Sequence, residues 1–142
     1  DPRVAACGLG CRDTLRLEAC YPLHGNDIDV SRDPIGAGLG FAAPAGLHAS
    51  VDRIREAGAA QRLVPVQVEG RGIPRAGTEV LVGESAVGVV TSGTMSPILR
   101  TGIALAWVDA DHAAIGTELG LDIRGSRAAA RVMQRPFVAG SL

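Results

Sequence analysis

The stretch RLVPVQVEGRGIPRAGTEVLVGESAVGVVTSG, residues 62–93, decides the fold because it repeats one pattern three times. Runs rich in β-branched residues occupy 63–69, 78–82 and 86–92, and the turn segments GRGIPRAG (70–77) and GES (83–85) separate them. This alternation is typical of strands joined by hairpins. Similar runs follow at 102–109, 117–123 and 127–133. Six short strands in about 80 residues predict a compact β-barrel or a sandwich.

Glycines punctuate these predicted strands. Gly125 and Ser126 lie between LDIR and RAAARV and predict a two-residue type II′ hairpin turn. Gly88 and Gly93 lie within or beside the third run, where glycine often marks a bend or a bulge. We therefore expect local irregularities of the sheet at these positions.

Upstream of the strands, the residue spacing predicts a helix over about residues 10–20. Cys11, Leu15 and Ala19 are spaced four apart and are the predicted buried face. Arg12 lies just beyond this row and Arg16 lies one turn later on the same side. Both guanidinium groups are therefore expected to reach the same cleft.

Arg12 is the unusual residue of this helix, because the macrodipole disfavours a cation near the helix N-terminus. In one interpretation, the face is solvated, and Asp13 offsets the macrodipole and pairs with Arg16 three residues later. In the other, Arg12 offers a planar, permanently charged donor to a carboxylate or a polar heterocycle. Spacing alone leaves both interpretations open.

Residues 21–50 are rich in Gly, Pro and Asp without a sustained period, and they predict connections at a domain boundary. Ser50 is a candidate N-cap for a short helix in VDRIREAGAA, and Gly58 is placed to end it. The chain begins DPRVAACG, with neither an initiator methionine nor a recognisable start to a domain. We therefore expect these residues to be the C-terminal part of a longer protein.

Composition narrows the class of protein. The chain is 46% hydrophobic with a formal net charge of -1, which disfavours nucleic acid and anionic membranes as partners. Neither a transmembrane run nor a signal peptide is visible in the sequence. Cys7, Cys11 and Cys20 crowd into one segment, which favours reduced, partly buried thiols and a cytoplasmic location.

Other site chemistries have weak support. Asp27, Asp29, Ser31 and Asp33 alternate like the start of a calcium loop, but the loop's glycine and glutamate are missing. Cys7, Cys11 and His24 lack a second closely spaced pair of metal ligands, so we predict no metal site. The three histidines have no placed nucleophile, and GLGCRD and GAGLGF lack the context of a nucleotide-binding loop.

The segments CGLGCRDTLRLEACYPLHGNDID (7–29) and PIGAGLGF (34–41) resemble the aminomethyltransferase family, the T-protein of the glycine cleavage system. Five further segments resemble the C-terminal half of that family in order and spacing: residues 62–81, VGVVTSGTMSPIL (87–99), IALAWV (103–108), GTELGLDIRG (116–125) and PFV (136–138). The resemblance spans nearly the whole chain.

The resemblance implies a mainly β fold with a short α/β N-terminal remnant and a C-terminal six-stranded β-barrel of the aminomethyltransferase type. Residues 1–49 would be the end of the folate-binding central region, and residues 50–142 the C-terminal barrel domain. The family forms a three-domain ring around a folate channel. It transfers a one-carbon unit from an aminomethyl group on the lipoyl arm of H-protein to tetrahydrofolate and releases ammonia.

By the same resemblance, Arg12 matches the arginine of the family's G-x-R-D-x-L-R motif that contacts folate, and Arg16 is the motif's second arginine, with a supporting role. The family's catalytic aspartate lies upstream, so this chain is expected to contain no catalytic residue and to be inactive alone. It would need the N-terminal domain of the same protein as well as H-protein and folate.

The sequence also departs from the family pattern. His24 and Phe41 replace the usual tyrosine and tryptophan, GLHASVD (46–52) replaces a lysine-bearing segment, and the end PFVAGSL lacks the usual basic or aromatic residues. Two other interpretations therefore remain. One is a folate-binding module of a related protein, such as an amine dehydrogenase terminal domain or an iron–sulfur assembly factor. The other is a β-barrel interaction module without catalysis.

Overall fold

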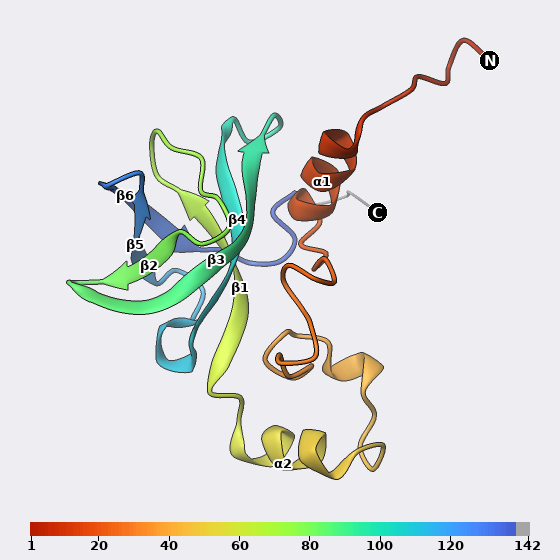
Figure 1. Cartoon of the computed structure of the whole chain (residues 1–142), viewed down its shortest axis with the longest axis vertical. Helices are drawn as coiled ribbons and strands as arrows, with labels where there is room; N and C mark the ends of the chain where they lie inside the picture. The colour runs from red at the N-terminus through yellow and green to blue at the C-terminus, as the bar shows by residue number, and fades with distance from the viewer. Residues whose placement is uncertain (139–142) are drawn as a thin grey trace.

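The computed structural model describes residues 1–138 and contains a closed six-stranded barrel. Its strands are β1 (Gln61–Val68), β2 (Glu79–Val82), β3 (Ser85–Ser96), β4 (Thr101–Asp109), β5 (Glu118–Ile123) and β6 (Ser126–Val132). All six neighbouring pairs are antiparallel, in the order β1-β4-β3-β2-β5-β6, and the pairing of β1 with β6 closes the barrel (Figure 1). The predicted mainly β fold with a six-stranded barrel is confirmed, and each predicted run corresponds to one strand.

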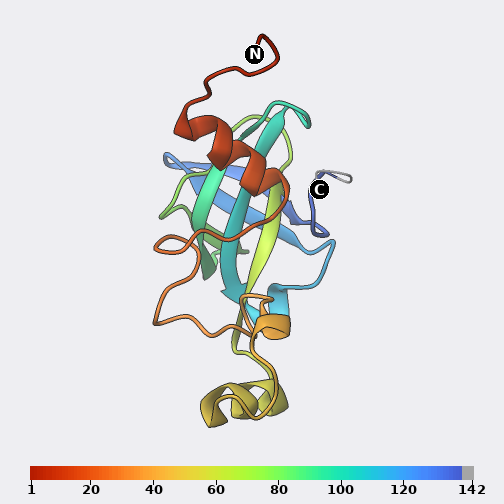
Figure 2. The ribbon, with the colours of Figure 1, turned by 90° about the vertical axis from the view of Figure 1, so that its right-hand side faces the viewer.

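The helical elements precede the barrel or interrupt it briefly. They are α1 (Leu9–Glu18), α2 (Ala49–Ala57) and two short 3-10 turns, η1 (Gly40–Ala42) and η2 (Ala110–His112). Helix α1 lies across the face of the barrel formed by β3 and β4, and α2 lies at the opposite end of the molecule (Figure 2). None of the helices within residues 1–138 has the length and apolar character needed to cross a membrane.

Strand β4 is buried on both faces, which explains its nearly continuous apolar sequence GIALAWV. Alternate residues point in opposite directions along a strand. Ala104, Ala106 and Val108 therefore join the valine-rich core inside the barrel. Ile103, Leu105 and Trp107 point outward and pack in a second core with Leu17, Cys20, Ala37 and Leu63. This second core attaches α1 and the connecting segment to the barrel.

The predicted buried face of α1 is wrong. Cys11 and Leu15 are exposed, and Leu15 keeps 58% of its surface accessible. The helix instead buries Leu17 and Glu18 against the barrel. One of its two most buried residues is charged, so apolar spacing alone pointed to the wrong side.

The structure places one predicted turn and one predicted helix cap at neighbouring residues. The β5–β6 loop is Arg124-Gly125, not Gly125-Ser126, and both residues have positive φ, at 57° and 77°, as a type I′ turn requires. Helix α2 has His48, not Ser50, at its N-cap, and it ends at Gly58 as predicted.

The two strand glycines permit close backbone approach. A Cβ atom at Gly88 would lie 2.2 Å from the carbonyl oxygen of Trp107, and one at Gly93 would lie 2.3 Å from that of Pro74. The bulge of β3 falls between them, where its register against β4 shifts between Val90 and Ser92. A second register shift, against β2, leaves Val87 unpaired directly beside Gly88. The expected irregularity is therefore present next to Gly88, and a further one lies at Thr91, two residues before Gly93.

Candidate functional site

Arg12 lies near the start of α1 on the surface of the molecule. The helix begins after Gly8, which provides no side-chain cap, and its first turn has no acidic residue. The Arg12 side chain is exposed and makes no hydrogen bond or ion pair with any residue from 1 to 138. Its guanidinium group is therefore available to a ligand from outside this chain.

Arg16, one turn further along α1, points into the protein instead. Its side chain is only 9% exposed and forms ion pairs with Asp13 and Asp27, each at 2.6 Å. It also donates to Ser92 Oγ at 2.9 Å and to the carbonyl oxygen of Tyr21 at 3.4 Å. The pairing with Asp13 expected from the i, i+3 spacing is present, but Arg16 does not share the exposed position of Arg12.

Asp27 is the centre of this polar cluster, and its side chain is completely buried. One carboxylate oxygen accepts hydrogen bonds from Arg16 at 2.6 Å and from the backbone N–H of Leu23 at 2.8 Å. The other accepts from the hydroxyl of Thr91 at 2.5 Å, and the backbone carbonyl of Asp27 accepts from Trp107 Nε1 at 2.7 Å. Asp27 thus joins α1, its own loop and two barrel strands.

The bulge in β3 places the hydroxyls that complete this cluster. The register shifts between Val90 and Ser92. Because of this shift, the consecutive residues Thr91 and Ser92 both form hydrogen bonds on the side of β3 that faces α1, with Asp27 and Arg16 respectively. Sequence reasoning missed both residues. Their only signal was a Thr-Ser pair ending the otherwise apolar run AVGVV.

A second polar contact fixes the C-terminal end of α1. The Glu18 carboxylate is 2% exposed and accepts a hydrogen bond from Ser96 Oγ at 2.5 Å. The Ser96 hydroxyl in turn accepts from the backbone N–H of Leu99 at 3.0 Å. The backbone carbonyl of Glu18 accepts from the backbone N–H of Phe137 at 3.0 Å. The C-terminal half of α1 is therefore attached to the barrel through Arg16 and Glu18, and Arg12 lies one turn before this anchor.

The acidic residues considered as calcium ligands have separate partners. Asp29 accepts hydrogen bonds from the backbone N–H and the hydroxyl of Ser31, and these two bonds lower the pKa of the Asp29 carboxyl. Asp33 accepts from the backbone N–H of Gly36. Among the described residues, no group of three or more His, Cys, Asp or Glu side chains is arranged to hold a metal ion.

The three cysteines are free thiols in two different environments. Cys20 is buried as expected, and its burial raises the pKa of the thiol. Cys7 and Cys11 are exposed, contrary to the expectation that the group is partly buried, and the nearby Cys7 thiol raises the pKa of Cys11. They lie at the start of α1, beside Arg12.

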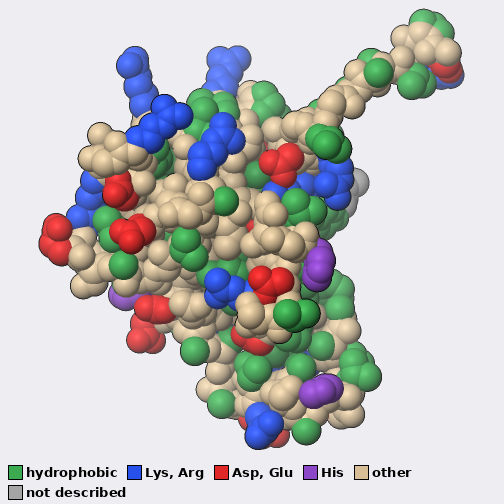
Figure 3. Space-filling model, viewed as in Figure 1, with side chains coloured by type: hydrophobic (Ala, Val, Ile, Leu, Met, Phe, Trp, Pro, Cys, Tyr) green, Lys and Arg blue, Asp and Glu red, His purple; other side chains and the backbone are tan. Residues whose placement is uncertain are grey.

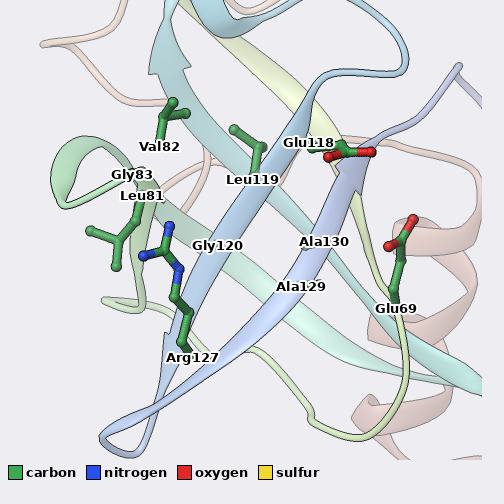
Figure 4. Close-up of a pocket in the computed structure, with 10 residues that line it drawn as sticks. All are labelled: Glu69, Leu81, Val82, Gly83, Glu118, Leu119, Gly120, Arg127, Ala129 and Ala130. Carbon is green, nitrogen blue, oxygen red and sulfur yellow. The ribbon is translucent and has the colours of Figure 1, made fainter.

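A separate hollow of about 530 Å³ lies on the side of the barrel formed by β2, β5 and β6. Figure 4 shows Arg127 directed toward Leu81 at one end of it, and Glu69 and Glu118 at the other. Both glutamates are ion-paired with Arg131, at 2.9 and 3.1 Å. The hollow has no residue of α1 in its lining, so it is distinct from the surface that carries Arg12.

Comparison with known proteins identifies the family. Residues 61–139 match the family model described as the glycine cleavage T-protein C-terminal barrel domain. The chain is 47% identical over 139 residues to an aminomethyltransferase of Symbiobacterium thermophilum, covering 92% of this chain and 36% of that protein. It is 48% identical over 140 residues to the aminomethyltransferase of Geobacillus kaustophilus, covering 94% of this chain and 38% of that protein.

A solved structure agrees with these relatives. The glycine cleavage system aminomethyltransferase T from Bartonella henselae superposes with a TM-score of 0.89 and 34% sequence identity, over 97% of this chain and 41% of that one. This chain therefore spans well under half the length of the relatives it matches. The barrel, its sequence match and this superposition together show that the chain belongs to the aminomethyltransferase family of the glycine cleavage system and contains that family's C-terminal barrel domain.

Proposed function

We propose that this chain forms one wall of the tetrahydrofolate site of an aminomethyltransferase, with Arg12 as its folate contact. In this proposal, residues 1–49 are the end of the folate-binding central region and residues 50–142 are the C-terminal barrel domain. The observation that carries it is the contrast along one helix. Arg16 is anchored in the polar cluster, whereas Arg12 is exposed and unpartnered within residues 1–138.

The chemistry of Arg12 suits a folate. Its guanidinium is planar, stays charged at physiological pH and can form two parallel charge-assisted hydrogen bonds to one carboxylate. The glutamyl carboxylates of a folate and the polar edge of its ring are both acceptors of this kind. Arg16 serves the site indirectly, because its contacts with Asp27 and Ser92 fix the position of the helix.

The complete reaction that we propose is the transfer of a one-carbon unit from an aminomethyl group on the lipoyl arm of H-protein to tetrahydrofolate, with release of ammonia. The names of the relatives support this reaction over a role as a dehydrogenase module, an iron–sulfur assembly factor or a non-catalytic interaction module. The free thiols support the cytoplasm as its location.

We further propose that the chain does not catalyse this transfer alone. Positioning of both substrates and acid–base groups from an upstream domain are required for the reaction. Turnover by the 142-residue chain, measured with aminomethyl-loaded H-protein and tetrahydrofolate, would contradict this part of the proposal.

Replacing Arg12 with alanine tests the folate contact. The experiment uses a protein of full family length that ends in this sequence and measures tetrahydrofolate binding by calorimetry. Loss of a charge-assisted hydrogen bond worth about 1.5–3 kcal/mol should raise Kd by roughly 10- to 100-fold. Arg53→Ala is the matched control, since Arg53 is an exposed arginine on α2. Micromolar binding that is unchanged by Arg12→Ala would refute the assignment.

A further inference from the structure

Exposed arginines other than Arg12 gather on the connections at one end of the barrel. The antiparallel pairing brings three connections to this end, the β1–β2 loop (69–78), the β3–β4 turn (97–100) and the β5–β6 turn (124–125). We call the surface formed by Arg71, Arg75, Arg100 and Arg124 on these connections the arginine end. Figure 3 shows basic side chains projecting over this part of the barrel.

These side chains make few contacts within the protein. Arg71, Arg100 and Arg124 are exposed, and none of their side chains forms a hydrogen bond or an ion pair within residues 1–138. Among the described residues, the only partner of the Arg75 side chain is the carbonyl oxygen of Gly93, to which it donates a long hydrogen bond of 3.3 Å. Contacts within the described part of the chain therefore do not explain why arginine occupies these four positions.

The backbone at two of them is also unusual for arginine. Arg100 and Arg124 have φ of 56° and 57°, a conformation that glycine and asparagine adopt with less strain. Among the described residues, the third non-glycine residue with positive φ is Cys20, which follows the end of α1. Local backbone preference therefore does not explain arginine at these two hairpin turns.

None of the acidic residues from 1 to 138 forms an ion pair with these four arginines. Glu69 is paired with Arg131 at 2.9 Å, and Asp122 accepts a hydrogen bond from the backbone N–H of Gly125 at 2.8 Å. Glu79, at the start of β2, is the remaining exposed carboxylate nearby. A chain whose formal net charge is -1 thus concentrates positive charge on one surface.

The surroundings of the arginine end favour a protein partner. Ile98 is 60% exposed and Met95 is 43% exposed, and both lie at or next to the β3–β4 turn that carries Arg100. Arginine and methionine are enriched in protein interfaces. None of the residues in the three connections is aromatic, so the bases of a single-stranded nucleic acid would find no stacking platform there.

A neighbouring hollow provides depth for a partner side chain. It measures about 410 Å³, lies between the β1–β2 loop and the β5–β6 hairpin, and has both Arg71 and Arg127 in its lining. Glu69 also lines this hollow but is paired with Arg131, and Arg127 pairs with Glu84 at 3.4 Å. An acidic side chain entering the hollow would therefore meet the guanidinium of Arg71, which is unpaired within residues 1–138. Bidentate pairing with carboxylates is the contact for which the arginine fork is best suited.

From these observations we propose that the arginine end is a docking surface for a protein partner that presents a cluster of Asp and Glu carboxylates. Such a surface raises the rate of encounter by electrostatic steering and loses affinity as salt increases. The proposal is independent of the folate site, because it uses neither Arg12 nor the polar cluster around Asp27.

The test measures binding of a fluorescein-labelled peptide of Asp, Glu and Leu to the full chain by fluorescence anisotropy, at low salt and at about 0.3 M salt. The test variant combines Arg71→Gln, Arg100→Asn and Arg124→Asn, since asparagine tolerates positive φ. The control variant combines Arg3→Gln, Arg53→Gln and Arg62→Gln, which removes the same number of charges from other surfaces.

We expect the test variant to bind the peptide at least tenfold more weakly than the control variant, with a melting temperature no lower than that of the parent chain. Arg71→Gln with Arg75→Gln alters no positive-φ residue, and it replaces the test variant if the turn substitutions prevent folding. Equal affinities of the test and control variants would overturn the proposal. Tighter binding of a single-stranded oligonucleotide than of the peptide would also overturn it.

Discussion

Replacing Asp27 with alanine should destabilise the protein by about 3 kcal/mol, because it leaves the buried cation Arg16 without its main partner. Removing one member of a buried ion pair costs about 3–5 kcal/mol. The lower end applies here, since Arg16 is still paired with Asp13, whose side chain is 43% exposed and therefore screened by solvent. Thr91 and the backbone N–H of Leu23 also lose an acceptor.

The expected change is large enough for a simple thermal assay. At about 2–4 °C per kcal/mol for a chain of this size, the melting temperature should fall by roughly 6–12 °C. Circular dichroism and urea unfolding both report this loss. Asp29→Asn is the matched control, because Asp29 lies two residues away but is exposed and keeps a suitable acceptor for Ser31.

A double-mutant cycle separates the ion pair from the other contacts. Arg16→Met removes the buried cation, so Asp27→Ala should cost less in that background than in the parent chain. A loss below about 1 kcal/mol in the parent chain, or one equal to that of Asp29→Asn, would refute the reasoning that Asp27 holds α1 to the barrel.

Three further perturbations test other features of the fold. Ser96→Ala should lower the free energy of unfolding by about 1–3 kcal/mol in urea titrations, because the buried Glu18 carboxylate loses its donor, and a loss under about 0.5 kcal/mol would contradict this. Gly88→Ala should destabilise the protein by about 3 kcal/mol, since the added Cβ would meet the backbone of β4. Gly10→Ala should stabilise the protein by up to about 1 kcal/mol, because the space around Gly10 in α1 is open. Equal melting temperatures of the two variants would argue against the close approach at Gly88. Burial raises the pKa of Cys20 above its usual value of 9.0, so the folded state disfavours the thiolate. The free energy of unfolding should therefore be unaffected below about pH 9 and should fall as the pH rises above it. The same fall in a Cys20→Ala variant would show that Cys20 is not its origin.

The barrel could be predicted from the sequence because each strand carries its own local signal. The β-branched runs and the turn residues between them give six strands without reference to distant contacts. The turn at Arg124-Gly125 was misassigned because arginine gives no local indication of positive φ. The irregularity beside Gly88 was predicted from the glycine, whereas the bulge at Thr91 was not, since the Thr91 hydroxyl contacts Asp27, which is far away in the sequence.

The orientation of α1 could not be predicted from periodicity. Its apolar residues Cys11 and Leu15 are exposed. Glu18 is buried because Ser96, which is 78 residues later in the chain, donates a hydrogen bond to its carboxylate. Apolar spacing identifies a buried face only when burial is apolar. Arg12 was identified from its position near a helix N-terminus and from the family motif. The anchoring of Arg16 by Asp27 could not be predicted, because no local sequence pattern relates these two residues.

Closure of the barrel through β1 and β6 has a consequence for how the chain folds during synthesis. The first strand needs the last one as a partner, as the pairing of Val66 with Val132 illustrates, so the ring stays open until β6 has left the ribosome. Until then β1 and β5 expose unpaired edges, which are sites of aggregation. Contacts this distant in sequence also slow folding. A nascent chain halted before residue 126 would depend on chaperones to cover those edges.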